Sequence, residues 1–213
     1  MSENAHDFKR DAAAKALELV EPGMVLGLGT GSTANAFISL LAERIKAQRL
    51  QLTCVATSLQ TERAARAAGI DVADFVELSE VDLTIDGADE IGPNLDLIKG
   101  GGGALLREKV VAMASARFCV IADSSKVVPR LGAFPLPVEI VDFGLSATLA
   151  MIEVVAEEAG CAGTVEIRRT ATGEPFRTNN GHLIAECALA HVAPAAFLPG
   201  ASLIVTPGKP QNG

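Results

Sequence analysis

Residues 24–45 read MVLGLGTGSTANAFISLLAERI, and they join an apolar strand, a glycine-rich turn and an amphipathic helix. The strand part is short and apolar, the turn carries Gly27, Gly29 and Gly31, and the helix repeats apolar residues at helical spacing. A strand that passes through such a turn into a helix is typical of a βα unit in a parallel sheet. The stretch therefore predicts an α/β fold, and its turn follows the carboxyl end of a strand, where sheets of this kind bind ligands.

The alternation of strands and helices continues on both sides of this stretch. The expected helices cover residues 7–20, 59–69 and 104–116, and the expected strands cover residues 50–58, 81–86, 95–99 and 117–123. Successive strands that are joined through helices run parallel to one another. The pattern predicts an open, doubly wound, mostly parallel sheet.

The composition changes after this series. The stretch LGAFPLPVEIV (131–141) predicts a linker or an edge segment, because proline cannot donate to a strand ladder. A helix is expected over 145–160, a strand over 164–170, two strands joined by a turn at Asn179-Asn180-Gly181 within 173–187, and a last strand with a frayed end over 201–213. We expect a Rossmann-like catalytic domain over 1–130, a small α+β domain over 131–200, and a final strand over 201–213 that returns to the main sheet.

The overall composition excludes several classes of protein. The chain has 213 residues, 49% of them hydrophobic, which is enough for a packed core and excludes global disorder. A net charge of −8 and only 4% aromatic residues argue against nucleic acid as a partner. No apolar run is long enough for a secretory signal or a membrane span. The four cysteines are dispersed, as buried reduced thiols are, and a cytoplasmic location is expected.

The first glycine turn, Gly27–Thr33, has the composition of an anion-binding loop. Glycines let the backbone approach a ligand, and the N-terminus of the following helix offers unpaired N–H groups to a phosphate. A Walker A loop is excluded because no lysine follows Gly31. Residues 29–34 fit the looser dinucleotide fingerprint, but the acidic residue expected about 20 residues later is missing. A plain tight turn and a nicotinamide site therefore stay open as alternatives to a phosphate site.

The second loop places three carboxylates, Asp86, Asp89 and Glu90, within five positions after the strand VDLTI. So many acidic groups at one sheet edge repel each other unless a cation, a metal or sugar hydroxyls meet them. A solvated acidic turn is the competing interpretation. The strand-end position favours a ligand site.

The third loop is Lys99 followed by the four glycines 100–103 and then by a helix that carries Glu108. Ordering four glycines costs much chain entropy, so a purely structural role is hard to motivate. Successive glycine N–H groups form a nest that binds an oxyanion, with Lys99 as the nearby cation. Glu108 can serve as a general base from the helix, although a surface ion pair is the competing interpretation.

Together, GLGTGSTA, TIDGADEI and IKGGGGALLREK resemble, in order and spacing, the A-type family of ribose-5-phosphate isomerases. The segments IADSSK and LGAFPLPVEI extend the resemblance, which covers residues 7 to 145. It implies an aldose–ketose isomerase of the non-oxidative pentose phosphate pathway, which interconverts ribose 5-phosphate and ribulose 5-phosphate through an enediolate. It also implies that no metal or organic cofactor is used, that the protein is a homodimer, and that its ligand is a small phosphorylated sugar.

The same resemblance assigns roles to single residues. It makes Glu108 the base that moves a proton between C1 and C2, and it makes Asp86 and Asp89 the residues that hold hydroxyls and assist ring opening. Lys99 would steady the developing oxyanion together with glycine amides. The implied substrate-binding residues are Lys9, Thr30, Gly31, Ser32, Thr33, Gly87, Ala88, Gly100, Gly101, Gly102 and Lys126. For Lys9, a solvated lysine is the competing interpretation.

The sequence departs from the family in one place, because HVAPAAFLPGASLIVTPG leads almost directly from the predicted turn at 179–181 to the last strand. The small α+β domain is therefore expected to be abridged. A sugar-phosphate sensor is a rival function, but it needs a DNA-binding module, for which the sequence offers neither the length nor the basic charge.

Overall fold

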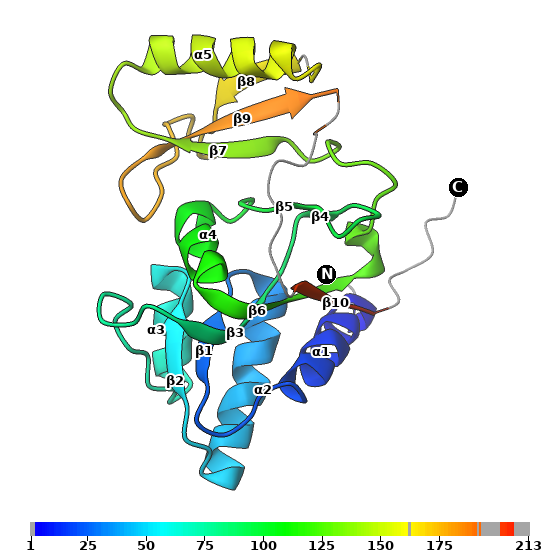
Figure 1. Ribbon diagram of the computed structural model, residues 1–213, viewed down its shortest axis with the longest axis vertical. Helices are drawn as coiled ribbons and strands as arrows, with labels where there is room; N and C mark the ends of the chain where they lie inside the picture. The colour runs from blue at the N-terminus through cyan, green and yellow to red at the C-terminus, as the bar shows by residue number, and fades with distance from the viewer. Residues whose placement is uncertain (1–2, 162, 191, 193–200, 207–213) are drawn as a thin grey trace. The chain divides into compact units, whose positions relative to one another are not determined.

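The computed structural model describes residues 3–161, 163–190, 192 and 201–206 (Figure 1). These residues form two compact units. The first contains the described residues within 1–88, 107–127 and 198–213, and the second contains those within 89–106 and 128–197. The domain limits expected from the sequence, at residues 130 and 200, stay a prediction. The segment 193–200 and the frayed end predicted at 207–213 lie outside the described residues.

The first unit is built on a five-stranded sheet in which all neighbouring strands run parallel. The strand order is β10-β6-β3-β1-β2. The strands are β1 Val25–Leu28, β2 Thr53–Ala56, β3 Val81–Asp86, β6 Ser115–Asp123 and β10 Ala201–Thr206. This sheet confirms the predicted α/β fold with a doubly wound, mostly parallel sheet.

Helices cover both faces of this sheet. They are α1 Glu3–Leu17, α2 Ser32–Gln48, α3 Leu59–Ala67 and α4 Leu105–Met113. Phe37 and Leu41 of α2 pack in the same core as Cys54 of β2, whereas Val111 of α4 packs with Val55, the next residue of β2. Because successive residues of a strand point to opposite faces, α2 and α4 lie on opposite sides of the sheet.

The strand order reverses at β1. From β1 the chain passes to β2 on one side, and it then returns to place β3 on the other side of β1. The carboxyl ends of β1 and β3 therefore flank the switch point, where open α/β sheets bind ligands. The glycine turn follows β1, and Asp86 ends β3.

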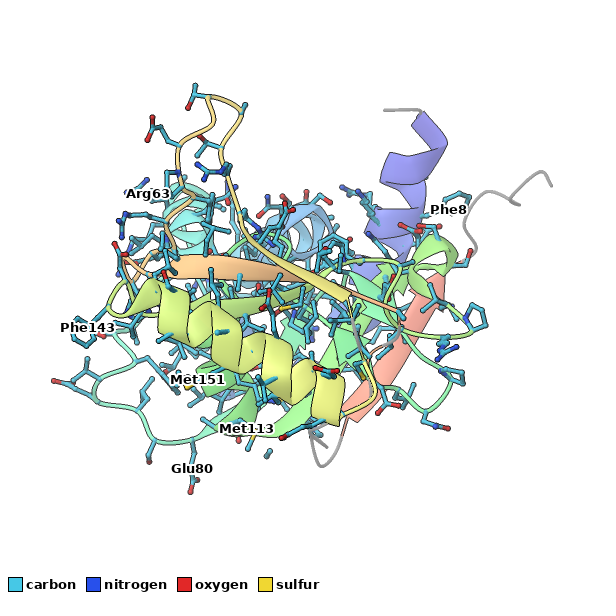
Figure 2. The ribbon with its side chains drawn as sticks, turned by 90° about the horizontal axis from the view of Figure 1, so that it is seen from above. Phe8, Arg63, Glu80, Met113, Phe143 and Met151 are labelled. Atoms are coloured by element: carbon cyan, nitrogen blue, oxygen red, sulfur yellow. The ribbon has the colours of Figure 1, made fainter. Side chains whose placement is uncertain are left out.

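The second unit contains a three-stranded antiparallel sheet with the order β7-β9-β8. Its elements are β7 Leu136–Ile140, α5 Leu145–Glu158, β8 Gly163–Ile167 and β9 Leu183–Leu189. Leu149 and Ile152 of α5 pack against this sheet, while Met151 on the same helix and Phe143 before it point away from it and are exposed (Figure 2). A separate two-stranded ribbon pairs β4 Glu90–Ile91 with β5 Leu97–Ile98.

The predictions for the second half of the chain have mixed outcomes. The proline-rich stretch forms β7, which is an edge strand as expected. The prediction of two strands within 173–187 is wrong, since only β9 forms there and the first arm makes a single bridge between Arg169 and Pro175. Both edges of β9 are already paired with β7 and β8, so no edge remains for that arm. The turn itself forms, with the Thr178 N–H donating to the His182 carbonyl at 3.0 Å.

The strand predicted over 95–99 forms as β5, but it pairs with β4 outside the parallel sheet. All four cysteines are free thiols and buried. Within the described residues, no helix is both long and apolar enough to cross a bilayer.

Candidate active site

The N-terminus of α2 is open to an anion. Gly31 is the N-cap residue with φ 109°, no side chain caps the helix, and its first turn has no acidic residue. The leading N–H groups and the helix dipole therefore favour a negative ligand at this end. Gly31 and Ser32 are exposed, and the Lys9 ammonium of α1 donates to Ser32 Oγ at 2.8 Å. The structure thus brings Lys9 to the glycine turn, as the sequence interpretation requires.

Four hydroxyl groups support this turn from behind. Thr30 Oγ1 lies 2.8 Å from Thr57 Oγ1, 2.9 Å from Ser58 Oγ and 3.0 Å from Thr61 Oγ1. Thr61 Oγ1 also donates to the Gly29 carbonyl at 2.9 Å. Thr57, Ser58 and Thr61 are buried. The Thr30 hydroxyl therefore faces the protein, and it fixes the turn at the end of β1 against the end of β2.

Asp86 ties the second loop to the first. Its Oδ1 accepts the Thr30 N–H at 3.0 Å and the Gly87 N–H at 2.7 Å, and the residue has no exposed surface. The contact requires a glycine at position 29, because a Cβ there would lie 2.2 Å from Asp86 Oδ1. The two backbone N–H groups donate to the same carboxylate oxygen and so fix the side chain in one position. Asp86 therefore brings a fixed, amide-bound carboxylate to the switch point.

Glu108 is the other buried carboxylate of the first unit. It lies in the first turn of α4 and is 5% exposed. Burial is unusual for a glutamate and removes it from the class of solvated surface residues. The first turn of a helix also favours a negative charge. The interpretation of Glu108 as an exposed surface residue is excluded.

The ribbon of β4 and β5 organises the third group of residues, within the second unit. Glu90 pairs with Ile98, and the Asp89 N–H donates to the Ile98 carbonyl at 2.9 Å. Lys99 directly follows β5 and leads into the glycine loop. Asp89 Oδ2 also accepts the Gly101 N–H at 2.8 Å. The Asp89 carboxylate and the glycine loop are thus one local group, and Lys99 is the residue that joins β5 to this loop.

Glu90 has a different role from its neighbour Asp89. It is 4% exposed, and its carboxylate accepts the N–H groups of Gly132 and Phe134 at 2.8 and 2.5 Å. These bonds hold the segment after β6 to the ribbon and leave Glu90 inside the fold. The acidic triplet of the sequence therefore contains one structural carboxylate.

Lys126 follows the carboxyl end of β6. It belongs to the short 3-10 helix η1 Ser124–Lys126, whose N-cap Asp123 accepts the Ser125 N–H at 2.9 Å. The half-buried Lys126 side chain therefore stands at the same edge of the sheet as the glycine turn and Asp86, because the strands are parallel.

The structure distributes the predicted residues over both units. The first unit holds Lys9, Thr30, Gly31, Ser32, Thr33, Asp86, Gly87, Ala88, Glu108 and Lys126, and the second holds Asp89, Lys99, Gly100, Gly101 and Gly102. In the described part of the chain, no group of three His, Cys, Asp or Glu residues could hold a metal ion. Sequence reasoning missed the support from Thr57, Ser58 and Thr61, although the strand ending in Thr-Ser was its visible signal.

Comparisons with known sequences point to one family. The sequence model of ribose 5-phosphate isomerase A (phosphoriboisomerase A) matches residues 53–204. A ribose-5-phosphate isomerase A of Bartonella bacilliformis is 50% identical over 210 residues, which cover 99% of this chain and 89% of the relative. One of Methylorubrum extorquens is 51% identical over 210 residues, which cover 99% of this chain and 88% of the relative.

Comparisons with solved structures point to the same family. A D-ribose-5-phosphate isomerase in complex with phospho-erythronic acid aligns with a TM-score of 0.82 and 33% identity, covering 89% of this chain and 81% of its own. The ribose 5-phosphate isomerase from Plasmodium falciparum aligns with a TM-score of 0.80 and 36% identity, covering 89% of this chain and 80% of its own.

Proposed function

The chain belongs to the ribose 5-phosphate isomerase A family, and we propose that it interconverts D-ribose 5-phosphate and D-ribulose 5-phosphate through an enediolate. The observation that carries this proposal is the identity of about one half over 99% of the chain to proteins of that name. The reaction belongs to the non-oxidative pentose phosphate pathway.

The phosphate group of the substrate would bind at the start of α2. The uncapped helix end, the exposed Gly31 and Ser32, and the Lys9 ammonium beside Ser32 support this assignment. Thr33 would donate an N–H group from the first turn of α2. Lys126 would add a second positive charge from the carboxyl end of β6. Thr30 would act on the substrate by fixing the turn, since its N–H and its hydroxyl both bind protein groups.

Glu108 would be the base. In the open-chain aldose it would take the proton from C2, the electron pair of that C–H bond would form the C1–C2 double bond, and the aldehyde oxygen would take the negative charge. The same carboxylic acid would return a proton to C1, while the proton of the C2 hydroxyl passes to the negatively charged C1 oxygen, so that C2 becomes the ketone and C1 carries the hydroxyl group. Burial in α4 supports this role, because a base held in one position and shielded from water acts more efficiently.

The remaining polar groups would bind the sugar and its developing charge. Asp86 and Asp89, with Gly87 and Ala88 between them, would hold hydroxyl groups and assist opening of the furanose ring. Lys99 and the amides of Gly100 and Gly102 would stabilise the enediolate oxygen, while the Gly101 amide holds the Asp89 carboxylate in place. The phospho-erythronic acid of the solved relative carries a carboxylate where an enediolate carries two oxygens, so we expect it to compete with the sugar phosphate.

The test is direct. Purified protein and ribose 5-phosphate should give ketose without added metal or nucleotide, and the same rate in EDTA. The Glu108→Gln variant should lose about 10²- to 10⁴-fold in kcat and keep its melting temperature. Glu153→Gln is the matched control, since Glu153 is an exposed glutamate of α5. A parent protein that binds ribose 5-phosphate but never turns it over would favour the sensor instead.

Two further features belong to the proposal. We propose a homodimer, which sedimentation of the purified chain would reveal, and a cytoplasmic location, which a fluorescent fusion would reveal. A monomer with full activity would contradict the first of these.

A further inference from the structure

We propose that Arg168 is a positioning residue for the reaction, because it fixes the peptide groups of the loop 100–103 in the orientation that presents amides to the substrate. The inference rests on the proposed isomerase function. Arg168 follows β8, far from the loop in sequence, and nothing in its RR context distinguishes it from a solvated arginine.

Arg168 is attached to the loop at two points. Its Nη1 donates to the Gly100 carbonyl and to the Gly101 carbonyl, each at 3.1 Å. Its Nε donates to Glu186 Oε1 of β9 at 2.7 Å, and the arginine side chain is 11% exposed. A nearly buried guanidinium that is paired with a carboxylate has a fixed position, so the two carbonyl groups are held by a rigid donor.

The aromatic ring of Phe176 completes this support. The Arg168 guanidinium carbon lies 5.7 Å from the centre of the ring. At the end of the loop, Gly103 has φ 76°, and a Cβ there would lie 2.6 Å from the Phe176 ring. Phe176 therefore closes against the last glycine while Arg168 holds the first two.

The carbonyl bonds decide where the amides point. In a planar trans peptide, the C=O and the following N–H point in opposite directions. Because Arg168 holds the Gly100 carbonyl, the Gly101 N–H is directed away from it and reaches Asp89 Oδ2 at 2.8 Å. Because Arg168 also holds the Gly101 carbonyl, the exposed Gly102 N–H is directed away from the arginine as well.

The Gly100 carbonyl also accepts the Gly103 N–H at 2.9 Å, and Asp89 holds the Gly101 N–H, so the loss of Arg168 chiefly releases the peptide between Gly101 and Gly102. A peptide between two glycines turns over at small steric cost, and it then presents a carbonyl oxygen where an amide stood. A carbonyl oxygen in that place would repel an enediolate. The loss of Arg168 should therefore raise the energy of the transition state more than it weakens binding of the phosphate group.

The test compares two inhibitors. For Arg168→Ala we expect kcat to fall by about 10- to 100-fold, as for a donor misplaced by about 1 Å, with KM nearly unchanged. The dissociation constant of phospho-erythronate should rise by a similar factor, while that of inorganic phosphate should stay at the parent value. Guanidinium ion at millimolar concentration should restore part of kcat, and Arg168→Lys should restore less than half of it because a lysine lacks the planar fork.

Arg177→Ala is the matched control. Arg177 also pairs with a carboxylate, Asp142, and donates to a carbonyl, that of Gly181, but it has no bond to the glycine loop. This variant should keep kcat and both inhibitor constants. If Arg168→Ala does not fold, Glu186→Gln provides the same comparison with almost no change in volume, and it should show a smaller loss of the same kind.

Two results would overturn the inference. One is a folded Arg168→Ala variant, or Glu186→Gln in its place, with the kcat of the parent. The other is an equal loss of affinity for phospho-erythronate and inorganic phosphate, which would indicate a general structural role. Neither result would contradict the proposed function, which is wrong only if the parent protein forms no ketose.

Discussion

Cys54 lies in the middle of β2 and is 1% exposed. Burial, with a smaller effect from the charge of Asp71, raises the pKa of its thiol from 9.0 to about 12. The native state therefore keeps the proton that the unfolded chain releases above pH 9.0. The stability that this provides is complete below pH 9.0 and is lost as the pH rises toward about 12.

We therefore predict that the free energy of unfolding falls between pH 9.0 and about 12, and that Cys54 accounts for up to about 1.4 kcal/mol per pH unit of this slope. Urea unfolding at a series of pH values measures it. Cys54→Ala should flatten the slope, and Cys161→Ala, which removes another buried thiol, should keep it. Equal slopes for both variants would show that Cys54 does not titrate in this range.

Residue types alone could not separate functional from structural side chains. Asp89 and Glu90 are adjacent acids, yet Asp89 binds the glycine loop and Glu90 binds the backbone of Gly132 and Phe134. Arg168 and Arg169 are adjacent arginines, yet only the first reaches the loop. Glu90 and Arg168 find their partners more than 40 residues away in the sequence, and no local pattern reveals such contacts.

The turn between β1 and α2 is the element to which we assign phosphate binding, and Asp86 holds it from β3. We predict that Asp86→Ala lowers the free energy of unfolding by about 1–3 kcal/mol, because two partly buried N–H groups lose their acceptor. It should also weaken the binding of inorganic phosphate several-fold, since the turn loses its anchor. Calorimetric titration with phosphate measures the second effect.

Asp82→Ala is the control in the same strand. Asp82 Oδ2 accepts the Val25 N–H at 2.7 Å at the other end of β1, away from the turn. This variant should lose some stability and bind phosphate like the parent. Equal phosphate affinities for the parent and Asp86→Ala would mean that Asp86 does not position the turn.

At the scale of elements, the long regular patterns were predictable and the short ones were not. The strands and helices of the parallel sheet follow from apolar runs that alternate with glycine turns and amphipathic stretches. The two-residue strands β4 and β5 are too short to leave a periodic signal, so their antiparallel pairing, next to which Asp89 binds the glycine loop, was not visible. The strand predicted before the turn at 179–181 does not form, because β9 pairs with β7 on one side and with β8 on the other.

Across the whole molecule, the chain leaves the first unit after residue 127 and returns to it for β10, which pairs with β6 over Ala201–Thr206 (Figure 1). We predict that ending the chain after residue 200 lowers the melting temperature by more than about 5 °C and promotes aggregation, because β6 then becomes an unpaired edge strand. Differential scanning calorimetry and light scattering measure both effects.

The matched truncation ends the chain after residue 206 and keeps the β10 pairing. Its melting temperature should equal that of the parent protein. If the chain that ends after residue 200 also has the melting temperature of the parent, β10 adds nothing to the stability of the sheet.

A net charge of −8 is compatible with a phosphorylated substrate because the site sets its own field. The start of α2, Lys9 and Lys126 supply positive potential at one edge of the sheet. The surface charge of the whole molecule therefore says little about what it binds.

The central claim is that a protein base moves a proton through an enediolate. Nuclear magnetic resonance of ribose 5-phosphate with the enzyme in D₂O and EDTA tests it most directly. We predict that ribulose 5-phosphate forms with solvent deuterium at C1, and that Glu108→Gln forms neither ketose nor deuterated sugar at a comparable rate. Ketose that forms with Glu108→Gln at the rate of the parent, or the absence of ketose from the parent reaction, would contradict the account.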